Sequence, residues 1–83
     1  MFVATYGRPT APAVLLLHGA GIAGWMWAPV IATLATRCHV IVPDLPGHGA
    51  SAHEPFTGLD DTAEELAALL PGATDVVGFS WGG

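Results

Sequence analysis

Three short apolar runs constrain the fold of this chain most. They are AVLLL (Ala13–Leu17), VIV (Val40–Val42) and DVVGF (Asp75–Phe79), and each has the length of a strand rather than of a core helix. Apolar runs without the alternation of a half-exposed strand are typical of strands buried on both faces of a parallel sheet. A weaker alternating run, Phe2–Tyr6, leads into a Gly-Arg-Pro turn and predicts one more short strand.

Helical patterns occupy the two connections between the three runs. Ala28–Arg37 carries an apolar stripe at helical spacing and has Pro29 in its first turn, where a helix tolerates proline. In the second connection we expect Asp61 to cap a helix, with Glu64 at capping-box spacing and a Pro-Gly pair at the end. The order of strand, helix, strand, helix, strand predicts an α/β fold, a mainly parallel sheet with helices on both faces in three layers.

The loop after the first buried run, HGAGIAG, contains the pattern G-x-G-x-x-G, formed by Gly19, Gly21 and Gly24. With Asp44 about twenty residues further on, the pattern resembles a dinucleotide-binding fingerprint, in which the glycines open a helix against a pyrophosphate. A helix that began near Gly21 would hold Pro29 in its third turn, at a penalty of about 3 kcal/mol. We therefore expect residues 19–27 to form a loop, with a dinucleotide-binding oxidoreductase domain as the alternative interpretation.

The last six residues, GFSWGG, contain G-x-S-x-G directly after the third apolar run, with Ser80 between Gly78 and Gly82. A serine on a tight strand-to-helix turn projects its hydroxyl above the sheet, and small neighbours are required because side chains there would collide with adjacent backbone. This context predicts that Ser80 is a catalytic nucleophile. The alternative interpretation is that Ser80 is only a small residue in a glycine-rich turn, which would suit a non-catalytic α/β scaffold.

Taken in order, these strand-loop segments resemble the α/β-hydrolase superfamily of the serine-nucleophile type. LLLHGAG is similar to its oxyanion loop, PDLPGHGAS to the loop after the following strand, and GFSWGG to its nucleophile elbow. The resemblance covers nearly the whole chain from Ala13. It implies attack by Ser80 on an ester-like carbonyl of a small-molecule substrate, an acyl-enzyme, and no cofactor. It also implies two oxyanion donors, the backbone amides of Ala20 and Trp81.

The resemblance also implies supporting residues around these loops. Glycines are expected to provide the turns of the oxyanion loop and of the elbow, at Gly19, Gly21, Gly78 and Gly82.

His18 is expected to order the oxyanion loop rather than to act as the base. Asp44 is expected to fix its own Pro-Gly loop, because the acid of the triad follows the serine in this superfamily. Trp25 and Trp27 either line a substrate pocket or pack onto the core.

Charge and cysteine content exclude several classes of protein. The formal net charge is −5, with two Lys or Arg residues in all, which argues against nucleic-acid binding. No two of the four histidines have a spacing that indicates a metal, and Cys38 beside His39 cannot chelate alone, so we expect no metal site. The lone cysteine, the short apolar runs and the lack of a basic leader predict a cytoplasmic protein without a membrane segment.

The apolar content, 52% of 83 residues, indicates part of a larger core, because small domains expose much of their surface. In the resembled superfamily the acid and the histidine of the triad follow the serine, and three residues follow Ser80 here. We therefore expect residues 1–83 to be the N-terminal part of one α/β-hydrolase domain, inactive and prone to aggregate when made alone.

The serine narrows the chemistry further. Relatives that resemble epoxide hydrolases and haloalkane dehalogenases carry aspartate at this position, so Ser80 favours cleavage of an ester, thioester, lactone, amide or carbon–carbon bond. The sequence leaves the substrate and the oligomeric state open.

Overall fold

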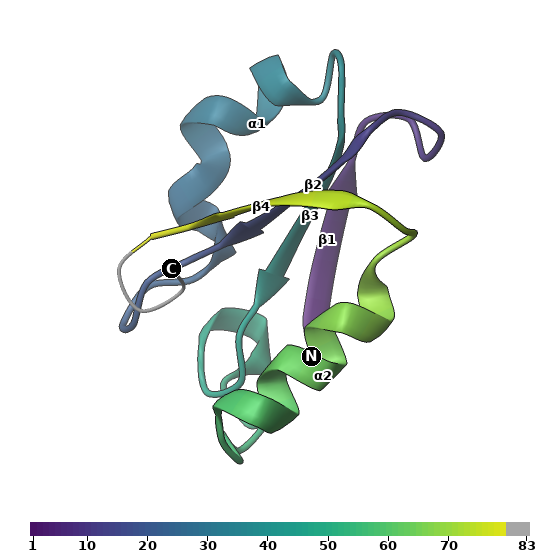
Figure 1. Cartoon of the computed structure of the whole chain (residues 1–83). Coiled ribbons are helices and arrows are strands. Elements are labelled where there is room, and N and C mark those ends of the chain that lie inside the picture. The colour runs from purple at the N-terminus through teal and green to yellow at the C-terminus, as the bar shows by residue number, and fades with distance from the viewer. Residues whose placement is uncertain (80–83) are drawn as a thin grey trace.

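The computed structural model describes residues 1–79, which form one sheet with a helix on each face (Figure 1). The strands are β1 (Phe2–Tyr6), β2 (Ala13–Leu17), β3 (His39–Asp44) and β4 (Thr74–Gly78). The helices are α1 (Ala28–Leu34) and α2 (Leu59–Leu69), with short 3-10 turns η1 (Gly24–Trp27) and η2 (Gly49–Ser51). The α/β fold class predicted from the apolar runs is thus confirmed.

The strand order is β1-β3-β2-β4, so β2 is flanked by two parallel neighbours. β1 pairs antiparallel with β3 at one edge of the sheet. The chain passes from β2 through α1 to β3 on one side, and then through α2 to β4 on the other side of β2. The direction of strand addition therefore reverses at β2, which makes the carboxyl end of β2 a topological switch point.

Alternate residues of the two central strands form two apolar clusters, one on each face of the sheet. The cluster facing α1 consists of Val14, Leu16, Val40 and Val42. The cluster on the α2 face consists of Ala13, Leu15 and Ile41. α1 packs Ile31 and Leu34 onto its cluster, whereas α2 brings only the following residue, Leu70, onto the opposite one.

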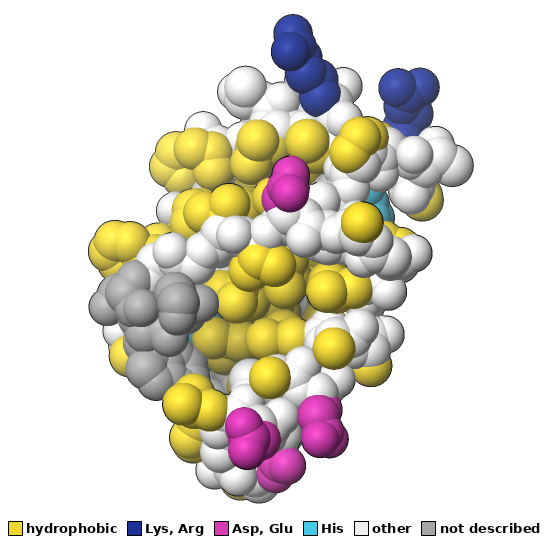
Figure 2. All heavy atoms as spheres, in the orientation of Figure 1, with side chains coloured by type: hydrophobic (Ala, Val, Ile, Leu, Met, Phe, Trp, Pro, Cys, Tyr) yellow, Lys and Arg dark blue, Asp and Glu magenta, His cyan; other side chains and the backbone are white. Residues whose placement is uncertain are grey.

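α2 lies loosely on the sheet in this part of the chain. Leu59 and Leu69, two residues of its apolar stripe, are exposed, and Thr62 is the buried residue of the helix. Figure 2 shows apolar side chains gathered in a hollow on this face of the molecule. The amphipathic pattern of α2 thus forms a helix without burying most of its apolar stripe within residues 1–79.

The start of α2 differs from the predicted cap. The helix begins at Leu59, and Gly58 occupies the N-cap position with no side-chain hydrogen bond to the free amides. Asp61 therefore lies inside the first turn beside Asp60, so the prediction that it caps the helix is wrong. Gly58 suits this position because its φ of 126° is one that residues with a side chain rarely adopt, and the two acids of the first turn still face the positive end of the helix dipole.

α1 is shorter than the predicted Ala28–Arg37. Its backbone bonds tighten after Leu34, whose carbonyl accepts from the amides of both Arg37 and Cys38. The chain then turns directly into β3, where the amide of His39 donates to Pro12. A carbonyl shared in this way closes the last turn of a helix and ends it.

The end of η2 and the residues after it bond to the start of the chain. The hydroxyl of Ser51, which is fully buried, accepts a 2.8 Å hydrogen bond from the amide of Phe2. The α-amino group of Met1 lies 2.7 Å from a carboxylate oxygen of Glu54, and this hydrogen bond raises the pKa of the amine. Within residues 1–79 no helix is both long enough and apolar enough to span a bilayer.

Candidate active site

The candidate site lies at the edge of the sheet where β2, β3 and β4 all end. β2 and β4 are in parallel register with Leu17 opposite Gly78, and the amide of Phe79 donates to the carbonyl of Leu17 at 3.1 Å. The loop that starts at His18 therefore leaves the sheet directly beside the chain that leads into the predicted elbow. In open α/β sheets, ligands bind at such a switch point outside the carboxyl ends of the strands.

Three of the predicted site residues, namely the nucleophile Ser80, the second amide donor Trp81 and the elbow glycine Gly82, lie outside the described residues. Gly78, the first elbow glycine, ends β4 and is exposed.

The loop after β2 turns sharply at Ala20 and Gly21. The amide of Ile22 donates to the carbonyl of Gly19 at 3.3 Å, and Gly21 has a φ of 78°, a left-handed conformation suited to glycine. Gly19 is buried, while Ala20 is exposed at the tip of the turn. Within the described part of the chain, the Ala20 amide donates to no backbone carbonyl.

His18 uses both ring nitrogens for backbone contacts. The ring is fully buried, and its Nε2 accepts a 2.9 Å hydrogen bond from the amide of Leu45. Because an amide N–H can only donate, the ring proton is on Nδ1, which lies 2.8 Å from the carbonyl oxygen of Gly19. This geometry suits a side chain that holds the backbone of the loop after β2 in place, and it leaves no ring nitrogen for proton transfer to a substrate.

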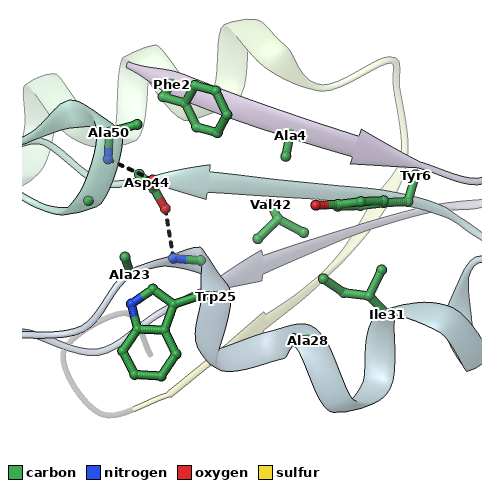
Figure 3. A pocket seen from close by; sticks show the side chains of 12 residues that line it. Phe2, Ala4, Tyr6, Ala23, Trp25, Ala28, Ile31, Val42, Asp44 and Ala50 are labelled. Carbon is green, nitrogen blue, oxygen red and sulfur yellow. Dashed lines mark hydrogen bonds between the residues drawn. The ribbon is translucent and has the colours of Figure 1, made fainter.

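Asp44, at the end of β3, bridges two loops through its carboxylate (Figure 3). One oxygen accepts from the amide of Gly24 at 2.7 Å, and the other accepts from the amide of Ala50 at 2.9 Å. A Cβ on Gly24 would lie 2.9 Å from the first oxygen, and a Cβ on Gly49 would lie 2.5 Å from the second. The two glycines are thus needed for the loops to approach the carboxylate.

The other histidines take different positions. The ring of His48 lies 5.0 Å from that of His18 at a tilted angle, and its Nδ1 is 3.1 Å from the carbonyl oxygen of Pro46. His39 starts β3, and His53 is exposed after η2. Across residues 1–79 no three His, Cys, Asp or Glu side chains come together in a way that could hold a metal ion.

The two tryptophans of the connection lie in different surroundings. Trp27 packs on the core cluster beneath α1. Trp25 is 72% exposed and lines a groove of about 480 Å³ between β1 and α1, together with Phe2 and Ile31 (Figure 3). The indole of Trp25 is therefore open to a ligand, whereas that of Trp27 is taken up by packing.

The glycine motif does not open a helix as a dinucleotide fingerprint requires. α1 begins at Ala28, with Pro29 in its first turn as predicted, and η1 separates it from the glycines. The predicted loop over residues 19–27 thus includes one 3-10 turn. In addition, β4 lies beside β2, whereas the common dinucleotide-binding order would place the third strand beyond the second.

The sequence pattern of the alpha/beta hydrolase family matches residues 14–83, and the chain belongs to this family. This confirms the resemblance drawn from the three loop motifs. The chain is 47% identical over 83 residues to a pimeloyl-(acyl-carrier protein) methyl ester esterase of Chromobacterium violaceum, and it spans 32% of that protein.

Solved structures show the same relationship. The type II thioesterase BorB from the borrelidin biosynthetic cluster superimposes with a TM-score of 0.79 at 30% identity, over 96% of this chain and 36% of BorB. A loop variant of the haloalkane dehalogenase DbeA from Bradyrhizobium elkanii gives a TM-score of 0.81 at 33% identity, over 96% of this chain and 28% of the dehalogenase. The chain thus spans about a third of the length of these relatives.

Sequence reasoning missed the contacts between the loop after β2 and the loop after β3. Asp44 was expected to hold its own loop, and the bond to Ala50 lies within that loop, but the bond to Gly24 joins it to the other one. The bond between His18 and Leu45 was not foreseen. Gly24 and Gly49 gave a partial signal, because glycine is the usual residue where a backbone must approach another group closely.

Proposed function

We propose that the full-length protein containing residues 1–83 is a serine hydrolase that cleaves ester-like bonds through an acyl-enzyme. The observation that carries the proposal is the parallel register of Leu17 and Gly78, which brings the end of the His-Gly loop's strand beside the strand that leads to Ser80. A hydrolase needs its oxyanion donors and its nucleophile next to each other, and neighbouring strand ends meet that need.

The proposed reaction begins with Ser80. Its hydroxyl oxygen bonds to the substrate carbonyl carbon, and its proton passes to a base elsewhere in the full-length protein. The backbone amides of Ala20 and Trp81 stabilise the oxyanion, and loss of one such donor typically costs about 3–4 kcal/mol of transition-state stabilisation. The alcohol or thiol then leaves with a proton, and water hydrolyses the acyl-enzyme. This chemistry needs no cofactor.

The substrate class proposed is a small-molecule carboxylic ester or thioester. The relatives support this choice, since one is named as a methyl ester esterase and another as a thioesterase. His18, Gly19, Gly21 and Asp44 would support the oxyanion loop, and Gly78 and Gly82 the elbow. Trp25 is the better candidate for a ligand contact, because Trp27 packs on the core.

Two broader proposals accompany this function. Residues 1–83 would form the N-terminal part of a single α/β-hydrolase domain. The free thiol of Cys38, the one cysteine of the sequence, favours a reducing, cytoplasmic location.

Replacement of Ser80 by alanine tests the proposal. In the full-length protein, Ser80→Ala should lower kcat for short-chain p-nitrophenyl esters about 10⁴-fold or more, because no acyl-enzyme can form. The other serine of the sequence provides the control, since the hydroxyl of Ser51 is fully buried and already accepts a hydrogen bond from the Phe2 amide. Ser51→Ala should lower thermal stability and keep kcat. A Ser80→Ala enzyme within tenfold of the unmodified protein would contradict the assignment.

A further inference from the structure

Two adjacent residues hold both ends of the oxyanion loop. At the start of the loop, His18 Nε2 accepts from the amide of Leu45 at 2.9 Å. At its end, the amide of Gly24 donates to Asp44 Oδ1 at 2.7 Å. We call this pair of contacts the clasp. Since Asp44 and Leu45 follow each other at the end of β3, the clasp ties the whole of residues 18–24 to one point of the sheet.

Further contacts fix the two side chains of the clasp. The His18 ring is oriented by its second nitrogen, 2.8 Å from the Gly19 carbonyl, and is fully buried. The second oxygen of Asp44 accepts from the Ala50 amide at 2.9 Å, so the carboxylate cannot rotate without losing a bond. Each side chain therefore has one bond for the clasp and one that sets its own orientation.

Ala20 lies between the two clasped ends, at the exposed tip of the turn. A short loop held at both ends has little freedom at its tip, whereas a loop held at one end could move its amide by an ångström or more. A donor displaced by about 1 Å can lose about a hundredfold in rate, because oxyanion stabilisation depends on a preorganised geometry.

We propose that His18 and Asp44 are positioning residues that together set the place of the Ala20 amide, and thereby the strength of oxyanion stabilisation. The inference rests on the function proposed above. It differs from a general stabilising role, since it requires that loss of either contact lowers kcat more than it raises KM. It also requires that the acceptor at the position of His18 Nε2 matters, rather than the imidazole itself.

Two amide replacements of His18 separate these requirements. In His18→Gln the side-chain amide can reach the place of Nε2 and accept from Leu45, while in His18→Asn it reaches only the place of Nδ1. In the full-length protein we expect His18→Asn to lower kcat about 10-fold to 100-fold with less than about a threefold change in KM, and His18→Gln to keep most of kcat.

Variants of Asp44 test the other end of the loop. Asp44→Ala removes both bonds and should lower kcat as His18→Asn does. Asp44→Asn keeps one oxygen for Gly24 but turns an NH₂ group toward the Ala50 amide, so its kcat should be intermediate. Affinity for a trifluoromethyl ketone, which forms an oxyanion on the serine, should fall in each variant by the same factor as kcat/KM.

Leu34→Ala is the matched control, because Leu34 lies on α1 and packs on the core cluster of β2 and β3, which includes neither His18 nor Asp44. It should lower thermal stability and leave kcat unchanged. The double variant His18→Asn/Asp44→Ala should lose less than the product of the single effects, because both contacts act on one amide. Equal kcat values for His18→Gln and His18→Asn, or losses matched by Leu34→Ala at equal stability, would overturn the inference.

An inactive unmodified protein would instead contradict the proposed function itself. In that case ¹⁵N spectra of the His18 ring would still report on the clasp, with Nδ1 protonated and Nε2 acting as the acceptor. Failure of the function and failure of the inference are therefore distinguishable: the first gives an inactive unmodified protein, and the second gives an active one whose kcat does not respond to the variants.

Discussion

Gly7 is the residue at which the backbone leaves least room. It has a φ of 77°, in the left-handed region, and an added Cβ would overlap the backbone carbonyl oxygen of Cys38 and lie 3.0 Å from that of Ala35. The turn after β1 is therefore pressed against the turn that joins α1 to β3. A side chain at this position would have to separate the two turns.

We predict that Gly7→Ala lowers the free energy of unfolding of the full-length protein by at least about 2 kcal/mol, through backbone strain and overlap together. Gly47→Ala separates these causes, because Gly47 has a similar φ of 84° but nothing within 4 Å of an added Cβ. It should lower stability by about 1 kcal/mol, from strain alone. Urea unfolding of the two variants measures the difference, and equal losses would show that the contact with Cys38 is unimportant.

The two helices show that packing, rather than an amphipathic sequence pattern, decides how much a helix contributes to stability. Both sequences are amphipathic, but α1 covers a four-residue cluster with Ile31 and Leu34, and α2 leaves Leu59 and Leu69 exposed within residues 1–79. Most helical stability in proteins comes from an apolar face packed against the rest of the structure. α1 should therefore be the better anchored of the two helices.

We predict that Leu34→Ala lowers the free energy of unfolding of the full-length protein by about 2–3 kcal/mol, because it removes contacts with the cluster on β2 and β3. Val30 on the same helix is 42% exposed and lies outside that cluster, so Val30→Ala should cost less than about 1 kcal/mol. Chemical denaturation of both variants tests the contrast. A larger loss for Val30→Ala would mean that α1 packs through its other face.

The exposed edge formed by β4 determines how residues 1–79 would behave in solution. Within residues 1–79, β4 is paired on one side, to β2, and Val76, Val77 and Phe79 are 55%, 44% and 51% exposed. An apolar edge strand without lysine or proline is prone to pair with another chain. The relatives are about three times as long as this chain, so in them there is ample further sequence to cover such an edge.

We predict that a polypeptide of residues 1–83 alone self-associates or stays molten and hydrolyses no ester. Sedimentation, thermal unfolding, dye binding and an esterase assay measure these properties. Val77→Lys should increase the monomer fraction, because a charge on the edge strand opposes pairing. A monodisperse monomer with a cooperative transition would contradict the structural half of the prediction, and ester turnover that Ser80→Ala abolishes would contradict the chemical half.

The local features of this protein could be predicted from its sequence. The strand bounds Phe2–Tyr6 and Ala13–Leu17 and the position of Pro29 in the first turn of α1 follow from the patterns of neighbouring residues. The order of the loop motifs also indicated the hydrolase family. The reason is that the spacing of apolar residues, the preference of certain residues for turns and the fixed geometry of proline all act over a few neighbouring residues.

Contacts between segments far apart in the chain became clear only from the three-dimensional structure. Three such contacts join parts that are far apart in the chain. They are the pairing of β4 with β2 rather than β3, the clasp of His18 and Asp44 with residues of other loops, and the contact of Gly7 with Cys38. The error at Asp61 has a local cause instead, because the helix begins at Leu59 after Gly58 and Asp61 therefore lies inside the first turn. Such contacts depend on how the strands and helices are placed relative to one another, and the pattern of residues along the chain does not specify this placement directly.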